Sequence, residues 1–333
     1  MKSFMITVFA LLAMIKVCYA GSEVVVYTSI DKVFSEPVLQ AFEKKTGIKV
    51  MTIYDTEETK STGLVNRLIA EKNKPKADVF WSGDPVRPVI LKIKGLTAPY
   101  VSGAAGDIPH TYKDPEGHWT GFSARSRIIL YNTNLVSTDE RPSSIFDLTK
   151  PVWRNQVAIA NPLFGTTSIH IAALFITLGD EKAIKFMNDL KANGVKIVSS
   201  NGEVKRLVAR GEVKAGITDT DDANVAMKEG CPVKMVFPDQ ATIGTLFMPN
   251  MVCLFKNSPN QENGRKLIDY LLSREVEKSL AWAACAQMPI RYDVRTPDNV
   301  TTIENIKGVD VNYSDVAKKL DEISDFLKQW AGY

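Results

Sequence analysis

The stretch E-V-V-V-Y-T-S-I-D-K-V-F-S-E-P-V-L-Q-A-F-E-K-K-T-G-I-K-V-M-T-I, residues 23–53, decides the fold class of this chain. Its β-branched run at 24–27 predicts a buried strand, and 48–53 predicts a second strand. Between them we expect a helix that is capped by Ser35 and ended by Gly47. A strand, a helix and a strand in this order are typical of a βαβ unit in a mostly parallel α/β sheet.

The alternation of strands and helices continues beyond this unit. An apolar stripe at 64–69 predicts a second helix, and 77–81 predicts a third strand. A new α/β series begins after a stretch rich in glycine and proline at 97–121, and a return strand is expected at 244–255. In the new series, strands are expected near 126–131, 157–160, 196–199, 214–218 and 233–237, and helices are expected to begin near Thr167, Asp180, Gly202 and Asp221. Further helices are expected at 261–272, 275–285 and 315–330.

Two α/β series joined by extended crossings predict two lobes with a hinged cleft between them. The chain has 333 residues, which is more than one hydrophobic core usually serves. We expect the first lobe to comprise residues 21–124 with 245–290, and the second 125–244 with 291–333.

Residues 1–20 resemble a cleaved secretory signal, with Lys2, an apolar run and the small-x-small ending of residues 18–20. The apolar run is too short to span a bilayer. Once this segment is removed the chain is close to neutral, which argues against a nucleic-acid binder. The remaining cysteines, Cys231, Cys253 and Cys285, are widely spaced in apolar surroundings. We expect buried thiols there rather than a zinc site, and a single disulfide stays open as an alternative.

Aspartates follow predicted strands in both lobes. In G-I-T-D-T-D-D-A-N (residues 216–224), Asp219 and Asp221 stand where open α/β sheets bind ligands, whereas Asp222 suits the first turn of a helix. Asp31 and Asp84 occupy the equivalent turns of the first lobe. Four converging carboxylates need a compensating cation, because buried anions repel one another and lose hydration.

Two kinds of cation would satisfy such a carboxylate cluster. Oxygen ligands suit hard metal ions such as Mg²⁺, Ca²⁺, Mn²⁺ and Fe³⁺. They also suit an ammonium group, to which Tyr27 and Trp81 could offer aromatic faces. Both aromatic residues fit a hydrophobic core equally well.

A candidate anion site precedes the apolar helix at 169–178. Free backbone N–H groups and hydroxyls at its start would favour an anion, although ordinary N-capping by Thr166 or Thr167 is the alternative. Arg125 and Arg127 are two apart on a predicted strand and could present guanidinium groups on one face. We expect Arg125 to line the cleft. The residues at the helix start are Gly165, Thr166, Thr167 and Ser168.

Several segments resemble, in order, the periplasmic ferric-ion-binding protein family of ABC importers. They are V-V-V-Y-T-S-I-D, F-E-K-K-T-G-I-K-V, A-D-V-F-W, W-T-G-F-S-A-R-S-R-I-I-L-Y-N-T and I-D-Y-L-L-S-R-E-V-E. The resemblance implies the two-lobed periplasmic-binding-protein fold (type II), which hands its cargo to a membrane permease. It also implies a synergistic anion held by 165–168, Arg125 and Asn201.

The metal-binding positions of that family are rewritten in this sequence. Asp31 stands in place of its histidine, Gly83 or Asp84 in place of its glutamate, and Thr220 and Asp221 in place of two adjacent tyrosines. The sequence therefore supports the transport role more firmly than iron as the cargo.

The leading prediction is a monomeric periplasmic solute-binding protein of an ABC importer that takes Fe³⁺ or another hard cation with an anion. The first alternative is an importer receptor for a small phosphorylated or phosphonate amine. A secreted metal-dependent hydrolase using the aspartates is the alternative from another class. No nucleophile elbow, P-loop or HExxH motif is present, so we expect no enzyme and no catalytic cofactor.

Overall fold

The computed structural model describes residues 22–55 and 62–333. The predicted signal at 1–20 lies outside the described residues. The strands are β1 (Glu23–Thr28), β2 (Lys49–Tyr54), β3 (Val79–Ser82), β4 (Thr97–Ala98), β5 (Thr120–Asn132), β6 (Val157–Ala160), β7 (Lys196–Val198), β8 (Ala215–Asp219), β9 (Val233–Val236) and β10 (Phe247–Phe255). The helices are α1 (Lys32–Thr46), α2 (Thr62–Ala70), α3 (Val86–Ile93), α4 (Gly165–Leu178), α5 (Asp180–Ala192), α6 (Asn201–Arg210), α7 (Thr220–Lys228), α8 (Gln261–Leu271), α9 (Arg274–Trp282), α10 (Tyr313–Glu322) and α11 (Ser324–Ala331).

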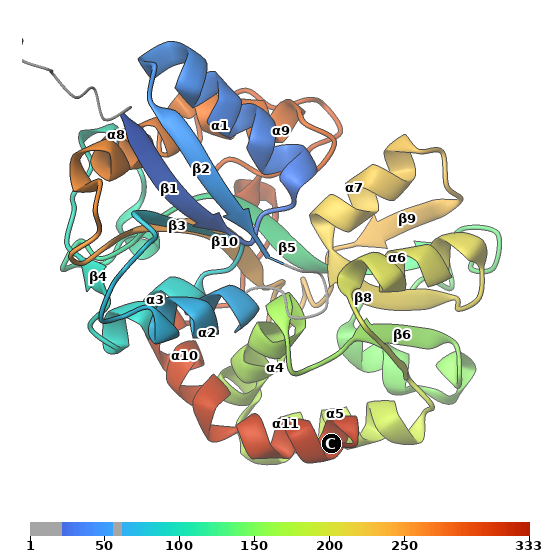
Figure 1. Cartoon of the computed structure of the whole chain (residues 1–333). Helices are drawn as coiled ribbons and strands as arrows, with labels where there is room; N and C mark the ends of the chain where they lie inside the picture. Colours follow the sequence, from blue (N-terminus) through green and yellow to red (C-terminus); the bar gives the residue numbers. More distant parts are fainter. Residues whose placement is uncertain (1–21, 56–61) are drawn as a thin grey trace, which may run out of the picture.

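One long strand, β5, joins two lobes. The strand order is β2-β1-β3-β10-β5-β8-β6-β7, with β4 on β10 and β9 on β5. Residues up to Ser126 pair with β10, and residues from Arg127 onward pair with β8 or β9. The first lobe is therefore built around β1–β4, β10 and the start of β5, and the second around the rest of β5 and β6–β9 (Figure 1).

The first βαβ unit forms as predicted, but its helix starts earlier. α1 begins at Lys32 after Asp31, so Ser35 lies inside the helix and the prediction that it caps the helix is wrong. Its hydroxyl donates to the carbonyls of Ile30 and Asp31, because serine in a helix can bond the carbonyl four residues back. Gly47 ends the helix with φ 72°, a left-handed conformation that glycine adopts without strain.

Two elements differ from the sequence prediction. α3 was not among the predicted helices. Pro85 precedes it and Pro88 lies in its first turn, where the missing N–H costs little. The single helix expected at 315–330 is instead two, α10 and α11, which meet at the buried residue Ile323.

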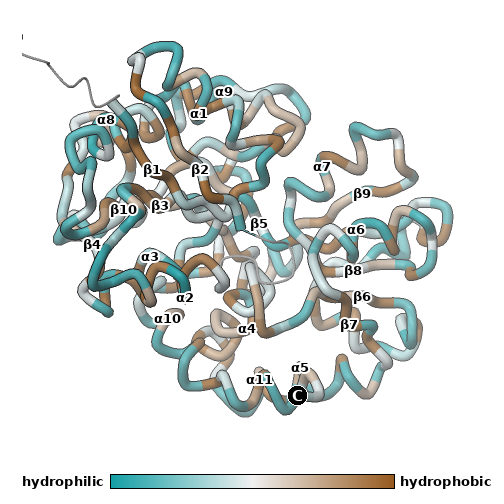
Figure 2. The backbone as a smooth tube through the Cα atoms, in the orientation of Figure 1, coloured by the Kyte–Doolittle hydropathy of each residue, from teal (hydrophilic) through white to brown (hydrophobic). Residues whose placement is uncertain are grey.

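Apolar side chains fill the interior of both lobes. Figure 2 shows the hydrophobic segments gathered along the central strands, with hydrophilic segments on the outer turns. One buried cluster runs from the first lobe through α4 to α10 and α11. α10 packs on α3, which follows a strand of the first lobe, and on α4, which belongs to the second. The assignment of residues 291–333 to the second lobe alone therefore stays a prediction.

The described cysteines are all free thiols. Cys253 and Cys285 are buried and Cys231 is half-buried, so the alternative of a disulfide among them is wrong. Burial raises the pKa of Cys285 to about 12, which keeps this thiol protonated and unreactive. Within residues 22–55 and 62–333, no helix combines the length and the apolarity that crossing a membrane requires.

Candidate functional site

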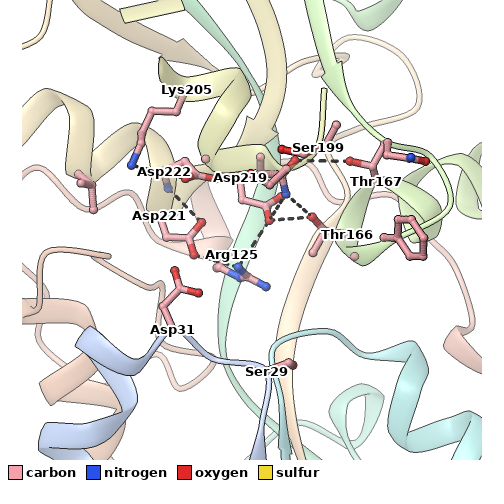
Figure 3. Close-up of a pocket in the computed structure, with 18 of the residues that line it drawn as sticks. Ser29, Asp31, Arg125, Thr166, Thr167, Ser199, Lys205, Asp219, Asp221 and Asp222 are labelled. Carbon is pink, nitrogen blue, oxygen red and sulfur yellow. Dashed lines mark hydrogen bonds and ion pairs between the residues drawn. The ribbon is translucent and has the colours of Figure 1, made fainter. Parts of the chain in front are cut away.

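A cavity of about 190 Å³ lies between the two lobes. The first lobe contributes the loop after β1 and the start of α1, and the second lobe contributes the starts of α4, α6 and α7 (Figure 3). These are the carboxyl ends of strands, where open α/β sheets place their ligands. The polar lining residues are Ser29, Asp31, Arg125, Asn161, Thr166, Thr167, Ser199, Ser200, Asn201, Lys205, Asp219, Asp221 and Asp222.

The start of α4 faces this cavity with an uncapped end. Phe164 is the N-cap residue and makes no side-chain cap hydrogen bond, so the alternative of N-capping by Thr166 or Thr167 is wrong. Gly165 has φ 56°, and no atom lies within 4 Å of where its Cβ would be. The N–H groups of this turn have no helical acceptor, and the helix dipole adds positive potential there. This end is therefore suited to an anion.

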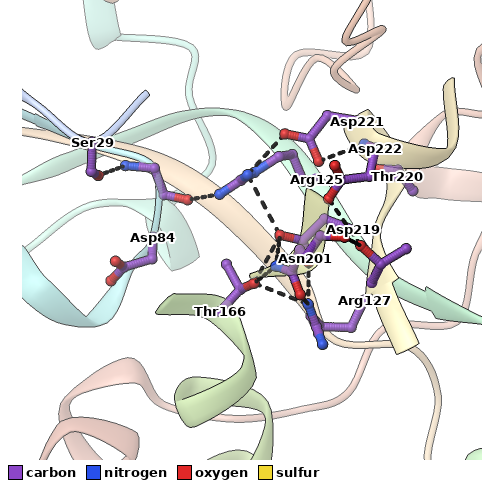
Figure 4. A network of polar contacts seen from close by, with 12 residues as sticks. Ser29, Asp84, Arg125, Arg127, Thr166, Asn201, Asp219, Thr220, Asp221 and Asp222 are labelled. Atoms are coloured by element: carbon purple, nitrogen blue, oxygen red, sulfur yellow. Dashed lines mark hydrogen bonds and ion pairs between the residues drawn. The ribbon is translucent and has the colours of Figure 1, made fainter. Parts of the chain in front are cut away.

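Arg127 lies behind the cavity in a buried ion pair. Its side chain is fully buried, and Nη1 donates to Asp219 Oδ1 at 2.6 Å. The same guanidinium donates to Thr166 at 3.0 Å (Figure 4) and to Thr167 at 3.3 Å. Burial alone would raise the pKa of Asp219, but the charges of Arg127 and Arg125 outweigh it and lower the pKa. Asp219 is thus ionised and forms an ion pair with Arg127.

Arg125 connects the two lobes at the floor of the cavity. Its Nη2 donates to the carbonyl of Gly83 in the first lobe, and Nη1 donates to Asp221 Oδ2 at 2.9 Å in the second. Burial alone would lower the pKa of Arg125, but Asp221 and Asp219 raise it. As predicted, this arginine lines the cleft.

Asn201 ties the starts of α4 and α6 together. Its Nδ2 donates to Thr166 Oγ1 at 2.8 Å and to Asp219 Oδ2 at 3.2 Å. Its Oδ1 accepts from Arg127 at 3.2 Å. The amide therefore fixes the walls of the cavity while its residue contributes to the lining.

Two charged residues that line the cavity, Asp222 and Lys205, were not predicted from the sequence to contact the ligand. Asp222, assigned to the helix dipole alone, lines the cavity, and its Oδ1 lies 3.8 Å from Lys205 Nζ. Burial, followed by the charges of Asp221 and Asp219, raises the pKa of Asp222 to about 7. Lys205 lies four residues after Asn201 on α6, and this spacing could have placed both on one helix face.

Of the four carboxylates that were expected to converge, one does not reach the cavity, and that part of the prediction is wrong. Asp31, Asp219 and Asp221 line the cavity, but Asp84 does not. Asp84 is buried, its Oδ1 accepts from the backbone N–H of Val86 and Arg87, and it points away from the other aspartates (Figure 4). A carboxylate that caps a helix start has its own structural use. Across residues 22–55 and 62–333, no three or more histidine, cysteine, aspartate or glutamate residues are grouped to hold a metal ion.

Three other predicted contacts lie away from the cavity. Trp81 is fully buried in the core of the first lobe, and Tyr27 is 1% exposed, with its hydroxyl donating to Glu71. Neither ring faces the cavity, because strands β1 and β3 are buried on both faces as parallel strands usually are. Ser168 is buried behind the α4 start, where its hydroxyl donates to the Gly165 carbonyl and accepts from Arg87.

Comparisons with known proteins agree with this architecture. The family described as bacterial extracellular solute-binding protein matches residues 74–315. The major ferric iron-binding protein of Neisseria meningitidis serogroup A is 24% identical over 90% of this chain and 90% of its own length. A Salmonella typhi periplasmic protein, provisionally named for 2-aminoethylphosphonate binding, is 28% identical over 87% of this chain and 85% of its own length. The crystal structure of iron-bound HitA from Pseudomonas aeruginosa superposes with a TM-score of 0.83 at 20% identity, covering 93% of this chain and 99% of that one. The chain thus has the expected two-lobed periplasmic-binding-protein fold.

Proposed function

This chain belongs to the bacterial extracellular solute-binding proteins, and on that premise we propose that it is the periplasmic receptor of an ABC importer for a small phosphorylated or phosphonate amine. The receptor would act as a monomer, close its lobes on the cargo and present it to a membrane permease. Membership of a solute-binding family favours this role over the metal-dependent hydrolase considered from the sequence.

The observation that carries the proposal is the presence of both kinds of charged site in one cavity. The uncapped α4 start and Arg125 would hold a phosphate or phosphonate by N–H donation and guanidinium contact. At the start of α7, beside Arg125, lie Asp221 and Asp222, for which burial and the charges of neighbouring aspartates raise the pKa. An ammonium group placed there would relieve this repulsion.

The size of the cavity supports a small cargo. A volume of about 190 Å³ is below the roughly 300–1,000 Å³ of pockets that hold drug-sized ligands. Such a space suits a two-carbon amine with one phosphorus group better than a drug-sized ligand.

Ferric iron with a synergistic anion, predicted first from the sequence resemblance, is the second candidate. The aspartates that line the cavity and the relatives named for ferric iron favour it. Against it, Fe³⁺ needs several ionised oxygen ligands, and two of the lining carboxylates are already neutralised in part, Asp219 by Arg127 and Asp221 by Arg125. A single ammonium group can be compensated by one carboxylate, and Asp222 also lines the cavity. The geometry therefore supports the amine more strongly.

Calorimetric titration of the ligand-free protein distinguishes the candidates. We expect 2-aminoethylphosphonate and phosphoethanolamine to bind, and ethylphosphonate, which lacks the amine, and ethanolamine, which lacks the phosphorus group, to bind at least about 10-fold more weakly. Binding at pH 7 should release protons as an ammonium group lowers the pKa of Asp222. Stabilisation by Fe³⁺ with phosphate or citrate, and by none of the amines, would replace the proposal with the iron candidate. Release of inorganic phosphate from phosphoethanolamine that is lost in Asp219→Asn would instead favour the hydrolase.

A further inference from the structure

A second cavity lies on the other side of Phe164, away from the aspartates. Its volume is about 310 Å³, and it is enclosed by α3, the loop before α4, and helices α10 and α11. Most of its wall is apolar, formed by Leu163, Phe164, Leu320 and Leu327. Phe164 lines both cavities, but the charged groups of the first cavity do not line the second.

A buried cation forms part of this apolar wall. Arg87 is 6% exposed, and its side-chain hydrogen bonds within the described part of the chain go only to hydroxyls, Thr62 Oγ1 at 3.1 Å and Ser168 Oγ at 3.3 Å. Its Nε is buried without a hydrogen-bond partner in the described residues. Burial lowers the pKa of Arg87, and the charges of Asp84 and Asp55 offset this effect only in part. The Arg87 guanidinium is therefore a desolvated cation with no hydrogen-bonded anion among residues 22–55 and 62–333.

The local hydrogen-bond chemistry can receive an anion. Thr62 Oγ1 accepts from Arg87, which leaves its own proton available for donation. Lys328 lines the cavity with a 56% exposed side chain and adds positive charge near the opening, although it also pairs with Asp325. A carboxylate at Arg87 would receive charge-assisted hydrogen bonds in a site with little water.

We propose that this second cavity binds a small monocarboxylate with a short hydrocarbon or aromatic portion, with its carboxylate on Arg87 and its apolar part against Phe164, Leu320 and Leu327. The cavity volume and the apolar wall with one convergent cation match the usual composition of small-molecule sites. The site is independent of the cargo proposed for the first cavity, so either assignment can fail without the other.

Titration of the full mature protein with three six-carbon probes tests the proposal. Hexanoate should bind with one site per chain and raise the melting temperature, whereas hexylamine and hexanol should bind at least about 10-fold more weakly. Equal binding of all three probes would mean an apolar cavity without anion recognition, and would overturn the proposal. Absence of hexanoate binding to the wild type at millimolar concentration would overturn it as well.

Variants locate the hexanoate site. Arg87→Met should weaken hexanoate binding at least about 10-fold, while Arg154→Met, which changes an exposed arginine, should leave it unchanged. Leu320→Trp keeps Arg87 and fills the cavity, so it should also abolish binding and serves if Arg87→Met does not fold. Hexanoate affinity that is unchanged in Leu320→Trp would place the probe elsewhere and contradict the proposal.

Discussion

Two buried arginines, one from each lobe, contact the start of α4 and have different surroundings. Arg127 in the second lobe is paired with Asp219 at 2.6 Å and also meets Thr166 and Thr167. The guanidinium of Arg87 in the first lobe donates hydrogen bonds only to hydroxyl groups in the described residues. The two side chains have the same chemistry and similar burial, so the presence of a carboxylate decides their roles. Arg127 is a structural ion pair, and Arg87 is a cation available to a ligand.

Removing each arginine is the strongest test of this difference. Arg127→Met should lower the free energy of unfolding by about 3–5 kcal/mol, because it leaves Asp219 buried without its closest cation. Arg87→Met should change it by less than about 1 kcal/mol, since no buried ion pair is broken. Urea denaturation measures both, with Arg154→Met as an exposed control. Equal losses from the two buried arginines would remove the distinction.

Substitution of Arg125 tests whether an arginine that contacts the start of α7 can both bind the cargo and stabilise the fold. Arg125→Met should weaken 2-aminoethylphosphonate binding by about 10- to 150-fold, the equivalent of about 1.5–3 kcal/mol for hydrogen bonds to a charged group. The loss of its contact with Asp221 also makes the cavity more negative, which disfavours the phosphonate further. Isothermal titration calorimetry gives the affinity, and Lys228→Met, at the exposed end of α7, is the control. An unchanged affinity would mean that Arg125 serves the fold alone.

Much of this arrangement could be predicted from the sequence, because strand and helix patterns determine where loops meet. The positions of Asp219, Asp221 and the 165–168 segment at the carboxyl ends of strands follow from the βαβ order. Sequence patterns do not show which carboxylate is bound to which arginine. Arg127 and Asp219 are 92 residues apart and become neighbours only through the register of β5 on β8.

The failures of the sequence prediction have a common physical cause. Asp84 and Asp219 both lie at the ends of strands, but Asp84 caps a helix within its own lobe, while Asp219 meets an arginine on the neighbouring strand β5. Tyr27 and Trp81 lie on strands covered on both faces, so neither ring reaches the cavity. Alternation alone cannot indicate such double coverage, because a buried parallel strand has no polar face.

Removing the hydroxyl groups that contact Arg127 and Arg87 at the start of α4 gives a smaller test of the contrast between these two arginines. Thr166 Oγ1 donates to Asp219 and accepts from Arg127 and Asn201, so Thr166→Val should cost about 1–3 kcal/mol by leaving buried charged groups unsatisfied. Ser168→Ala removes one long contact with Arg87 and a bond to a backbone carbonyl, and should cost less. Thermal and urea unfolding of both variants compare the two faces. A larger loss from Ser168→Ala would contradict the assignment of the ion pair to the Arg127 side.

The pH dependence of stability tests the acidic side of the cleft and should give the smallest effect. The folded-state pKa of Asp222, about 7, is above its unfolded value of about 3.9, so the folded state binds more protons between these values. Its contribution to stability is therefore present at low pH and is lost as pH rises through 7. Asp222→Asn should gain stability over the wild type by about 1 kcal/mol between pH 6 and pH 7. Urea denaturation at each pH measures this difference.

The difference in unfolding free energy between Asp222→Asn and the wild type does not contain the opposing pH effect of His170. Burial, followed by the charge of Arg127, lowers the pKa of His170 to about 3, so this group destabilises the fold as pH falls below about 6.5. That effect is shared by the wild type and Asp222→Asn, and cancels in their difference. Asp321→Asn, at an exposed aspartate on α10, should show no such trend. If Asp222→Asn and Asp321→Asn behave alike from pH 5 to pH 8, the acidic side is not crowded with negative charge, and the case for an ammonium group there loses its support.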